Sequence, residues 1–183
     1  MRVIAGAFKG RRLLAPRWAG VRPTSDKVRE TLFNVLAPEV RDARVLDAYA
    51  GTGALGIEAL SRGAKTATFI ERDPRVRDLI AQNLAHCGIL EGCAIIRASV
   101  TRGLDALSRA PAFVPFDIVL LDPPYELAAA DALTGIEAVT RPGGLVVLEH
   151  ARRRPSPDLA GRLVRTRELP SGSTALTFYR CRP

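Results

Sequence analysis

The sequence predicts an α/β fold built on a doubly wound, mostly parallel sheet. Five short apolar runs, over residues 44–49, 66–71, 94–97, 116–121 and 145–149, alternate with helical patterns as in βαβ units. A glycine-rich turn follows the first run and a proline-rich turn follows the fourth, at the edge where open sheets bind ligands. Because these signals agree, we expect a ligand site at the carboxyl ends of the strands.

Local start and stop signals predict the helices between these strands. Asp73–Pro74 combines an aspartate N-cap with proline in the first turn, and the apolar stripe after it continues to Gly88. Gly63 stands where the left-handed residue after a helix over 53–62 belongs. Further helices are expected around residues 104–107 and over 128–140.

The two ends of the chain flank this alternating middle. A helix is expected from Ser25, capped by Thr24 or Ser25 and ended by Pro38. Residues 2–16 can form a small hairpin. A closing hairpin is predicted from strands over 162–169 and 174–181 around the turn 170–173. We expect one domain over 1–183, with a basic N-terminal hairpin extension over 1–24 and a Rossmann-like body over 25–183.

Composition excludes several classes of protein. The chain has 183 residues, 47% hydrophobic and 25% charged, which is typical of a globular domain and not of a disordered or collagen-like chain. No apolar run reaches the roughly 20 residues that span a bilayer, and no signal-peptide pattern opens the sequence. We therefore expect a cytoplasmic protein with no membrane partner. Three cysteines without CxxC spacing and two histidines predict no metal site.

The net charge of +8 is unevenly distributed. Residues 1–30 and 151–183 each carry eight basic and two acidic residues, whereas residues 31–150 carry 11 basic and 15 acidic ones. Basic ends can bind a polyanion such as nucleic acid by releasing counterions from its phosphates. General arginine enrichment of the surface explains the same numbers, and a solvated loop is a sufficient interpretation of Arg152–Arg154.

The glycine-rich turn is the first candidate site. Gly51, Gly53 and Gly56 spell GxGxxG, so an NAD-dependent oxidoreductase is one hypothesis. Asp47 favours another ligand, because a carboxylate four residues before the first glycine would repel a pyrophosphate and attract a cation. S-adenosylmethionine is cationic at its ammonium and sulfur and has no phosphate. Glu71, at the end of the second strand, suits hydrogen bonding to ribose in either class.

The second candidate site is the sequence Asp122–Pro123–Pro124–Tyr125 after the fourth strand. The exocyclic amine of a nucleobase is a poor nucleophile because its lone pair is delocalised into the ring. Asp122 Oδ and the carbonyl of Pro123 can accept its two hydrogens and favour tetrahedral nitrogen, while the prolines hold both acceptors in place. Tyr125 can stack on the base, which contributes about 1–3 kcal/mol. This pattern predicts methylation of an amine.

With these motifs in view, the chain resembles a known family. The DPPY sequence with the DxxxGxG loop resembles the class I S-adenosylmethionine-dependent amino-methyltransferases. The segments from Arg2 to Leu13 and from Arg22 to Asn34 (RPTSDKVRETLFN) are similar to the bacterial 16S ribosomal RNA guanine-N2 methyltransferases. That resemblance runs the length of the chain. It implies a Rossmann-like class I methyltransferase fold, with a mostly parallel seven-stranded sheet, a C-terminal hairpin and a small N-terminal β-hairpin plus helix.

The resemblance also implies a reaction and the residues that perform it. The reaction is transfer of methyl from S-adenosylmethionine to the N2 amine of one guanine in 16S rRNA, on a small ribosomal subunit or its assembly intermediate. We expect a monomer. Carried over by position, the catalytic residues are Asp122, Pro123 and Tyr125. The cofactor-binding residues are Asp47, Ala48, Gly51, Gly53, Glu71, Ser99, Thr24 and Asp26, and the RNA-binding residues are Arg2, Lys9, Arg11, Arg12 and Arg22.

Three other functions stay open on the sequence. The same DPPY chemistry serves DNA adenine-N6 methyltransferases, although 183 residues leave no obvious target-recognition domain. The NAD-dependent oxidoreductase is a more distant alternative. A ribosome-binding protein without enzymatic activity is the third.

Overall fold

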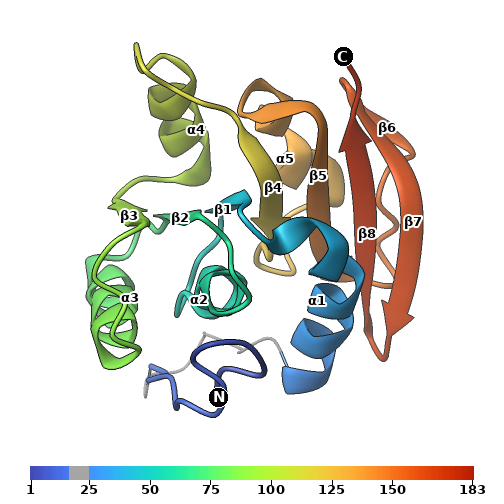
Figure 1. Ribbon diagram of the computed structural model, residues 1–183. Helices are drawn as coiled ribbons and strands as arrows, with labels where there is room; N and C mark the ends of the chain where they lie inside the picture. Colours follow the sequence, from blue (N-terminus) through green and yellow to red (C-terminus); the bar gives the residue numbers. More distant parts are fainter. Residues whose placement is uncertain (17–24) are drawn as a thin grey trace.

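A single mixed sheet organises the protein, whose computed structural model describes residues 1–16 and 25–183. Eight strands lie in the order β3-β2-β1-β4-β5-β8-β7-β6 within the described residues (Figure 1). Neighbours from β3 to β5 pair in parallel, and β8, β7 and β6 add antiparallel pairs. The strands are β1 (Arg44–Asp47), β2 (Thr66–Ile70), β3 (Cys93–Ile96), β4 (Phe116–Leu121), β5 (Thr140–Ala151), β6 (Leu159–Ala160), β7 (Leu163–Ser171) and β8 (Thr174–Cys181).

Helices cover both faces of the sheet. Figure 1 shows α1, α2 and α3 on one face and α4 and α5 on the other. Successive strand residues point to opposite faces, so Val45 packs under α1 and α2 while Leu46 packs toward α4 and α5. The helices are α1 (Asp26–Val40), α2 (Ala54–Ser61), α3 (Pro74–His86), α4 (Val100–Ser108), α5 (Ala129–Leu133) and the 3-10 helix η1 (Ile136–Ala138).

The predicted helix signals are confirmed. The Ser25 side chain accepts a hydrogen bond from the Val28 amide at 3.2 Å and caps α1. Asp73 caps α3 by accepting from the Arg75 amide at 2.9 Å, with Pro74 as the first helical residue. Gly63 has φ +96°, the left-handed conformation expected after α2.

Three predicted boundaries are wrong. Pro38 does not end α1, which continues to Val40 because that side chain is buried against the sheet. The helix over 128–140 is replaced by α5 and η1, since Gly135 between them has φ +77° and interrupts the helical path. β5 therefore begins at Thr140, before the predicted start at 145. Over residues 1–16 and 25–183 the sheet has eight strands where seven were expected, because the two residues of β6 pair with β7.

The predicted N-terminal hairpin is present in a short form: Arg2 and Arg12 form an antiparallel bridge, and backbone hydrogen bonds join Val3 to Arg11 and Gly10 and join Leu13 to Met1. Residues 1–14, called here the N-terminal arm, are held by side chains of the body. The amides of Ile4 and Ala5 donate to the Glu58 carboxylate at 2.8 and 3.0 Å, and Leu14 donates to Asn83 Oδ1 at 2.7 Å. The arm is thus docked against α2 and α3.

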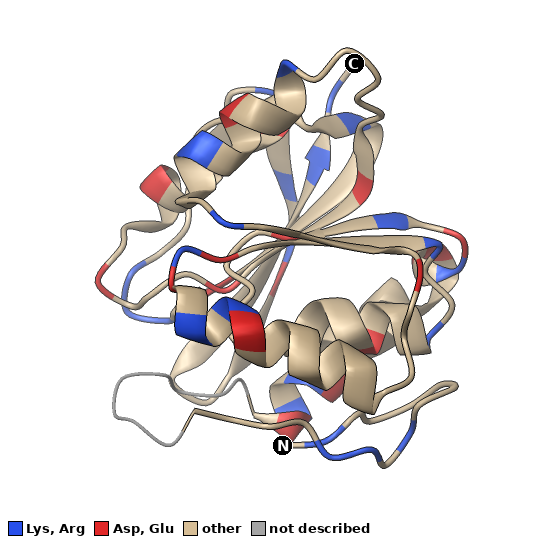
Figure 2. Ribbon diagram, turned by 90° about the vertical axis from the view of Figure 1, so that its left-hand side faces the viewer, with Lys and Arg blue, Asp and Glu red and all other residues tan. Residues whose placement is uncertain are grey.

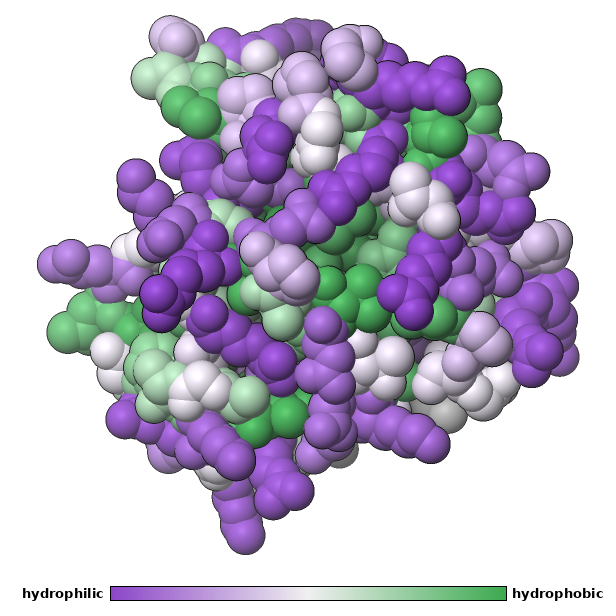
Figure 3. Space-filling view, turned by 45° about the vertical axis from the view of Figure 1, so that its right-hand side comes forward, coloured by the Kyte–Doolittle hydropathy of each residue, from purple (hydrophilic) through white to green (hydrophobic). Residues whose placement is uncertain are grey.

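The surface over the N-terminal arm differs from the surface over the antiparallel strands. Figure 2 shows blue basic residues along the arm, on the side of the molecule away from the C-terminus. On the side that carries β7, hydrophilic side chains cover most of the surface in Figure 3, with smaller apolar areas between them. Among the described residues, no helix is long and apolar enough to cross a bilayer.

Candidate active site

A cavity of about 1000 Å³ opens at the carboxyl edge of the parallel strands. Ser99 follows β3, Glu71 follows β2 and the glycine loop follows β1, so these residues line one half, called here the glycine-loop half. The other half, called here the DPPY half, is lined by residues after β4, at the end of β5 and in the β7–β8 turn. Strand order therefore brings the two predicted motifs into one cavity.

Asp47 lies beneath the glycine loop and is fully buried. Its Oδ2 accepts a hydrogen bond from the Gly56 amide at 2.9 Å, and Oδ1 has no hydrogen-bond partner within the described part of the chain. Burial raises the pKa of Asp47 to about 7. The carboxylate does not line the cavity. It accepts from the first turn of α2 and so fixes that turn under the loop, and the expected contact of Asp47 with a cofactor stays a prediction.

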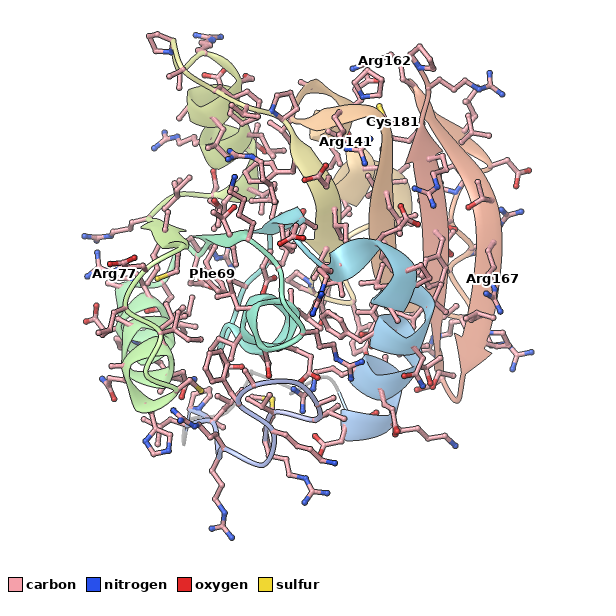
Figure 4. The ribbon with its side chains drawn as sticks, viewed as in Figure 1. Phe69, Arg77, Arg141, Arg162, Arg167 and Cys181 are labelled. Atoms are coloured by element: carbon pink, nitrogen blue, oxygen red, sulfur yellow. The ribbon has the colours of Figure 1, made fainter. Side chains whose placement is uncertain are left out.

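The three glycines have separate structural roles. Gly51 (φ +51°) lines the cavity, whereas Gly53 (φ +78°) is turned toward Ile80 and Phe69 and does not line it. A Cβ on Gly56 would lie 2.2 Å from the ring of Phe69, which Figure 4 places at β2 beside α2. The third glycine thus serves close helix–strand packing.

Glu71 stabilises the rim of the glycine-loop half. Its Oε2 accepts from the Gly51 amide at 3.1 Å and its Oε1 accepts from the Asp73 amide at 2.8 Å. Both oxygens keep further lone pairs for hydroxyl donors in the cavity. Ser99 caps α4 and also lines this half, and its expected contact with adenine stays a prediction. Apolar walls that the sequence analysis did not assign come from Ile70, Val76 and Val100.

The DPPY half combines the predicted turn with two residues that sequence reasoning missed. Asp122, Pro123 and Tyr125 line the cavity, with Pro123 buried and Tyr125 37% exposed. Arg154 Nη1 donates to the carbonyl oxygens of Tyr125 and Glu126 at 2.9 and 3.0 Å. Arg154 is therefore more than a residue of a solvated basic loop. Glu149, a buried carboxylate on β5, also faces the cavity.

Residues at the start of α1 close the cavity on a third side. Ser25 and Lys27 line it, but Asp26 does not. Asp26 instead forms ion pairs with Arg29 at 2.7 Å and Arg2 at 3.7 Å. Asp26 thus links α1 to the arm, and its expected place at the border of the cofactor pocket stays a prediction. Thr24 and Arg22 lie outside the described residues.

The arm presents the other predicted RNA-binding residues. The Arg2 side chain is 69% exposed, and Lys9, Arg11 and Arg12 are exposed. Arg11 lies over the ring of Phe8 at 5.5 Å and its Nη1 donates to the His86 carbonyl at 3.3 Å. Both ends of the arm approach the rim of the cavity. Arg2 forms its ion pair with Asp26, the neighbour of Ser25 in the sequence. At the other end, the Asn83 side chain donates to the Leu14 carbonyl and to the Thr52 carbonyl of the glycine loop. In the described part of the chain, no group of His, Cys, Asp and Glu residues could hold a metal ion.

Fold and site together define a class I S-adenosylmethionine-dependent methyltransferase. The family model described as "Conserved hypothetical protein 95" matches residues 1–180. The YlbH protein of Bacillus subtilis is 37% identical over 185 residues, covering all of both chains. Ribosomal RNA small subunit methyltransferase D of Haemophilus influenzae is 37% identical over 85% of this chain and 81% of its own. The solved yhhF structure from Escherichia coli matches with a TM-score of 0.85 and 33% identity, covering 100% of this chain and 98% of that one. The chain belongs to this family of rRNA methyltransferases.

Proposed function

We propose that the protein transfers a methyl group from S-adenosylmethionine to the N2 amine of a guanine in small-subunit ribosomal RNA. The observation that carries this proposal is the convergence of Asp122 and Pro123 with the glycine loop and Glu71 in one cavity. The names of the relatives support the small-subunit RNA. The docked basic arm supports a polyanionic substrate, on an assembled or partly assembled particle.

The glycine-loop half fits S-adenosylmethionine by its chemistry. The Glu71 carboxylate suits the ribose hydroxyls, and Ile70, Val76 and Val100 offer apolar walls to the purine beside Ser99. Ala48 and Gly51 would border the methionyl part, above the Asp47 carboxylate, whose Oδ1 accepts no hydrogen bond from any described residue. When bound, the cofactor supplies a methyl group activated on a positively charged sulfur.

Asp122 and Pro123 activate the amine in this proposal. The Asp122 carboxylate and the Pro123 carbonyl accept the two N2 hydrogens, which draws the nitrogen toward tetrahedral geometry and localises its lone pair. Positive charge develops on the nitrogen as it is methylated, so the interaction with Asp122 strengthens toward the transition state. The Asp122 carboxylate then accepts the proton that the methylated nitrogen loses. Tyr125 stacks on the base at the cavity mouth.

The reaction is tested with labelled S-adenosylmethionine and small-subunit particles from a strain that lacks this enzyme. We expect label in the RNA, and no transfer where a control methyltransferase succeeds would contradict the proposal. Digestion to nucleosides separates guanine-N2 methylation from the adenine-N6 alternative. Titration with S-adenosylhomocysteine and with NAD separates a methyltransferase from an oxidoreductase. Binding of particles without transfer would indicate the non-enzymatic role.

A further inference from the structure

Glu149 is a buried carboxylate in the cavity that the proposed chemistry does not use. It is 7% exposed and lines the DPPY half. Leu148 pairs with Leu121 in the parallel β4–β5 ladder, so Glu149 follows one member of this pair within β5 and Asp122 follows the other directly after the end of β4. Adjacent strands lie about 4.8 Å apart, and side chains at equivalent register point to the same face. Both side chains line the same cavity, so the two carboxylates lie near each other at this edge of the sheet.

This pair of acceptors matches one edge of one base. Guanine presents the N1–H donor directly beside its N2 amine, whereas adenine and 2-aminopurine present an N1 lone pair beside their amines. An ionised carboxylate can only accept hydrogen bonds. We propose that Glu149 selects guanine by accepting its N1–H while Asp122 and Pro123 accept the N2 hydrogens. This inference rests on the proposed function and adds the residue that determines base specificity.

The position of Glu149 suits a specificity residue. It lies in β5, which is paired with β4 on one side and with β8 on the other, where Glu149 is opposite Leu176. A side chain on a central strand is held more firmly than one on a loop. A base with a lone pair on N1 would make no hydrogen bond to this carboxylate. The lone pair and the carboxylate oxygen would also repel each other in a buried site. Sites of this kind discriminate far more strongly than apolar pockets do.

The test uses 2-aminopurine, which keeps the reactive 2-amine, offers an N1 lone pair to Glu149 in place of N1–H, and also lacks the O6 atom of guanine, so the Glu149 variants below separate the effect of N1 from that of O6. The guanine methylated by the wild-type protein is mapped first, and particles are then assembled with guanine or 2-aminopurine at that position. We expect the wild-type protein to methylate guanine at least about 100-fold faster. Equal rates on the two bases would overturn the proposal without any variant.

Variants assign the discrimination to Glu149. Glu149→Gln can donate to the N1 lone pair, so its guanine preference is expected to fall at least about tenfold. Glu149→Asp keeps the carboxylate and is expected to keep the preference at a lower rate. Glu30→Gln removes a charge from an exposed side chain of α1 that does not line the cavity and is expected to leave the preference unchanged.

The outcomes separate this inference from the proposed function. Each variant is first shown to bind S-adenosylhomocysteine within about twofold of wild type, which reports an intact fold. A folded Glu149→Gln protein with the wild-type preference would overturn the assignment while leaving guanine methylation intact. Failure of the wild-type protein to methylate any guanine would instead contradict the proposed function.

Discussion

Arg154 Nη1 donates a hydrogen bond to the carbonyl oxygen of Tyr125 at 2.9 Å and thereby joins the segment after β5 to the DPPY turn. The same nitrogen donates to the Glu126 carbonyl at 3.0 Å. The main chain of Arg154 is held in turn, because its carbonyl accepts a hydrogen bond from His150 Nδ1 at 3.0 Å. The DPPY turn is thus held by a residue 29 positions away in sequence.

Loss of the hydrogen bonds from Arg154 is expected to slow methyl transfer. It is not expected to weaken RNA binding more than loss of a neighbouring arginine does. We predict that Arg154→Ala lowers kcat about 10- to 100-fold, because a small displacement of Asp122 and Pro123 misaligns the amine. Arg153→Ala removes the same charge from an exposed neighbour and is the matched control. Steady-state kinetics on particles measure both. Equal kcat values for the two variants would show that Arg154 acts only through its charge, and Arg154→Lys should recover part of the loss.

Asp47 makes the stability of the protein depend on pH. Its pKa is raised from 3.8 to about 7, chiefly by burial, so the folded state keeps a proton that the unfolded state has already released between these values. The free energy of unfolding therefore falls as pH rises from about 4 to about 7 and stays reduced above that, by as much as about 4 kcal/mol. Asp47→Asn is expected to remove this component. Urea denaturation of both proteins at pH 5 and pH 8 measures it, and identical pH dependence would contradict the assignment.

Glu58 anchors the arm and balances a buried arginine. Its carboxylate is fully buried, accepts from the Ile4 and Ala5 amides, and lies 3.9 Å from the buried Arg29 guanidinium. We predict that Glu58→Gln destabilises the protein by about 3 kcal/mol, because the buried Arg29 loses one of its two carboxylate partners and keeps only the half-exposed Asp26. Denaturant titration measures the loss, with the exposed Glu30→Gln as control. Hydrogen exchange at residues 4 and 5 should accelerate, and full protection there would argue against the anchoring role.

The arm and the antiparallel strands are expected to differ in RNA binding. Lys9→Ala should reduce the slope of log affinity against log salt by about 0.7 to 0.9, the contribution of one phosphate contact. Arg167→Ala serves as the comparison, because Arg167 points outward from β7, far from the arm (Figure 4). Particle binding is measured between about 50 and 200 mM salt. An unchanged slope for Lys9→Ala would remove Lys9 from the RNA contact surface.

Most of the fold was predictable because its signals are local. Apolar runs, the Asp73–Pro74 helix start and the glycine after α2 each act within one turn or strand. The errors arose where tertiary context decides. Val40 extends α1 past Pro38 because its side chain is buried, and Gly135 interrupts a segment whose composition favours a helix.

The candidate site was predictable where a residue's place directly after a strand determines that it lines the cavity. Glu71 and Asp122 line the cavity because both directly follow parallel strands. The direction of the Asp47 side chain was not predictable, since it depends on the path of the loop above it. Arg154 reaches the DPPY turn only in the folded chain, and no sequence motif marks that contact. The sequence did place Glu149 at the end of a predicted buried strand, but Glu149 belongs to no motif that would have marked it as a site residue.

The central claim is that Asp122 activates a guanine amine, and single-turnover transfer followed by nucleoside analysis tests it most directly. Wild-type protein and Asp122→Asn are each mixed with labelled S-adenosylmethionine and unmethylated small-subunit particles. We predict N2-methylguanosine as the product, with transfer by Asp122→Asn slowed at least about 100-fold and S-adenosylhomocysteine affinity within about twofold of wild type. Label in N6-methyladenosine, or transfer by Asp122→Asn at the wild-type rate, would contradict it.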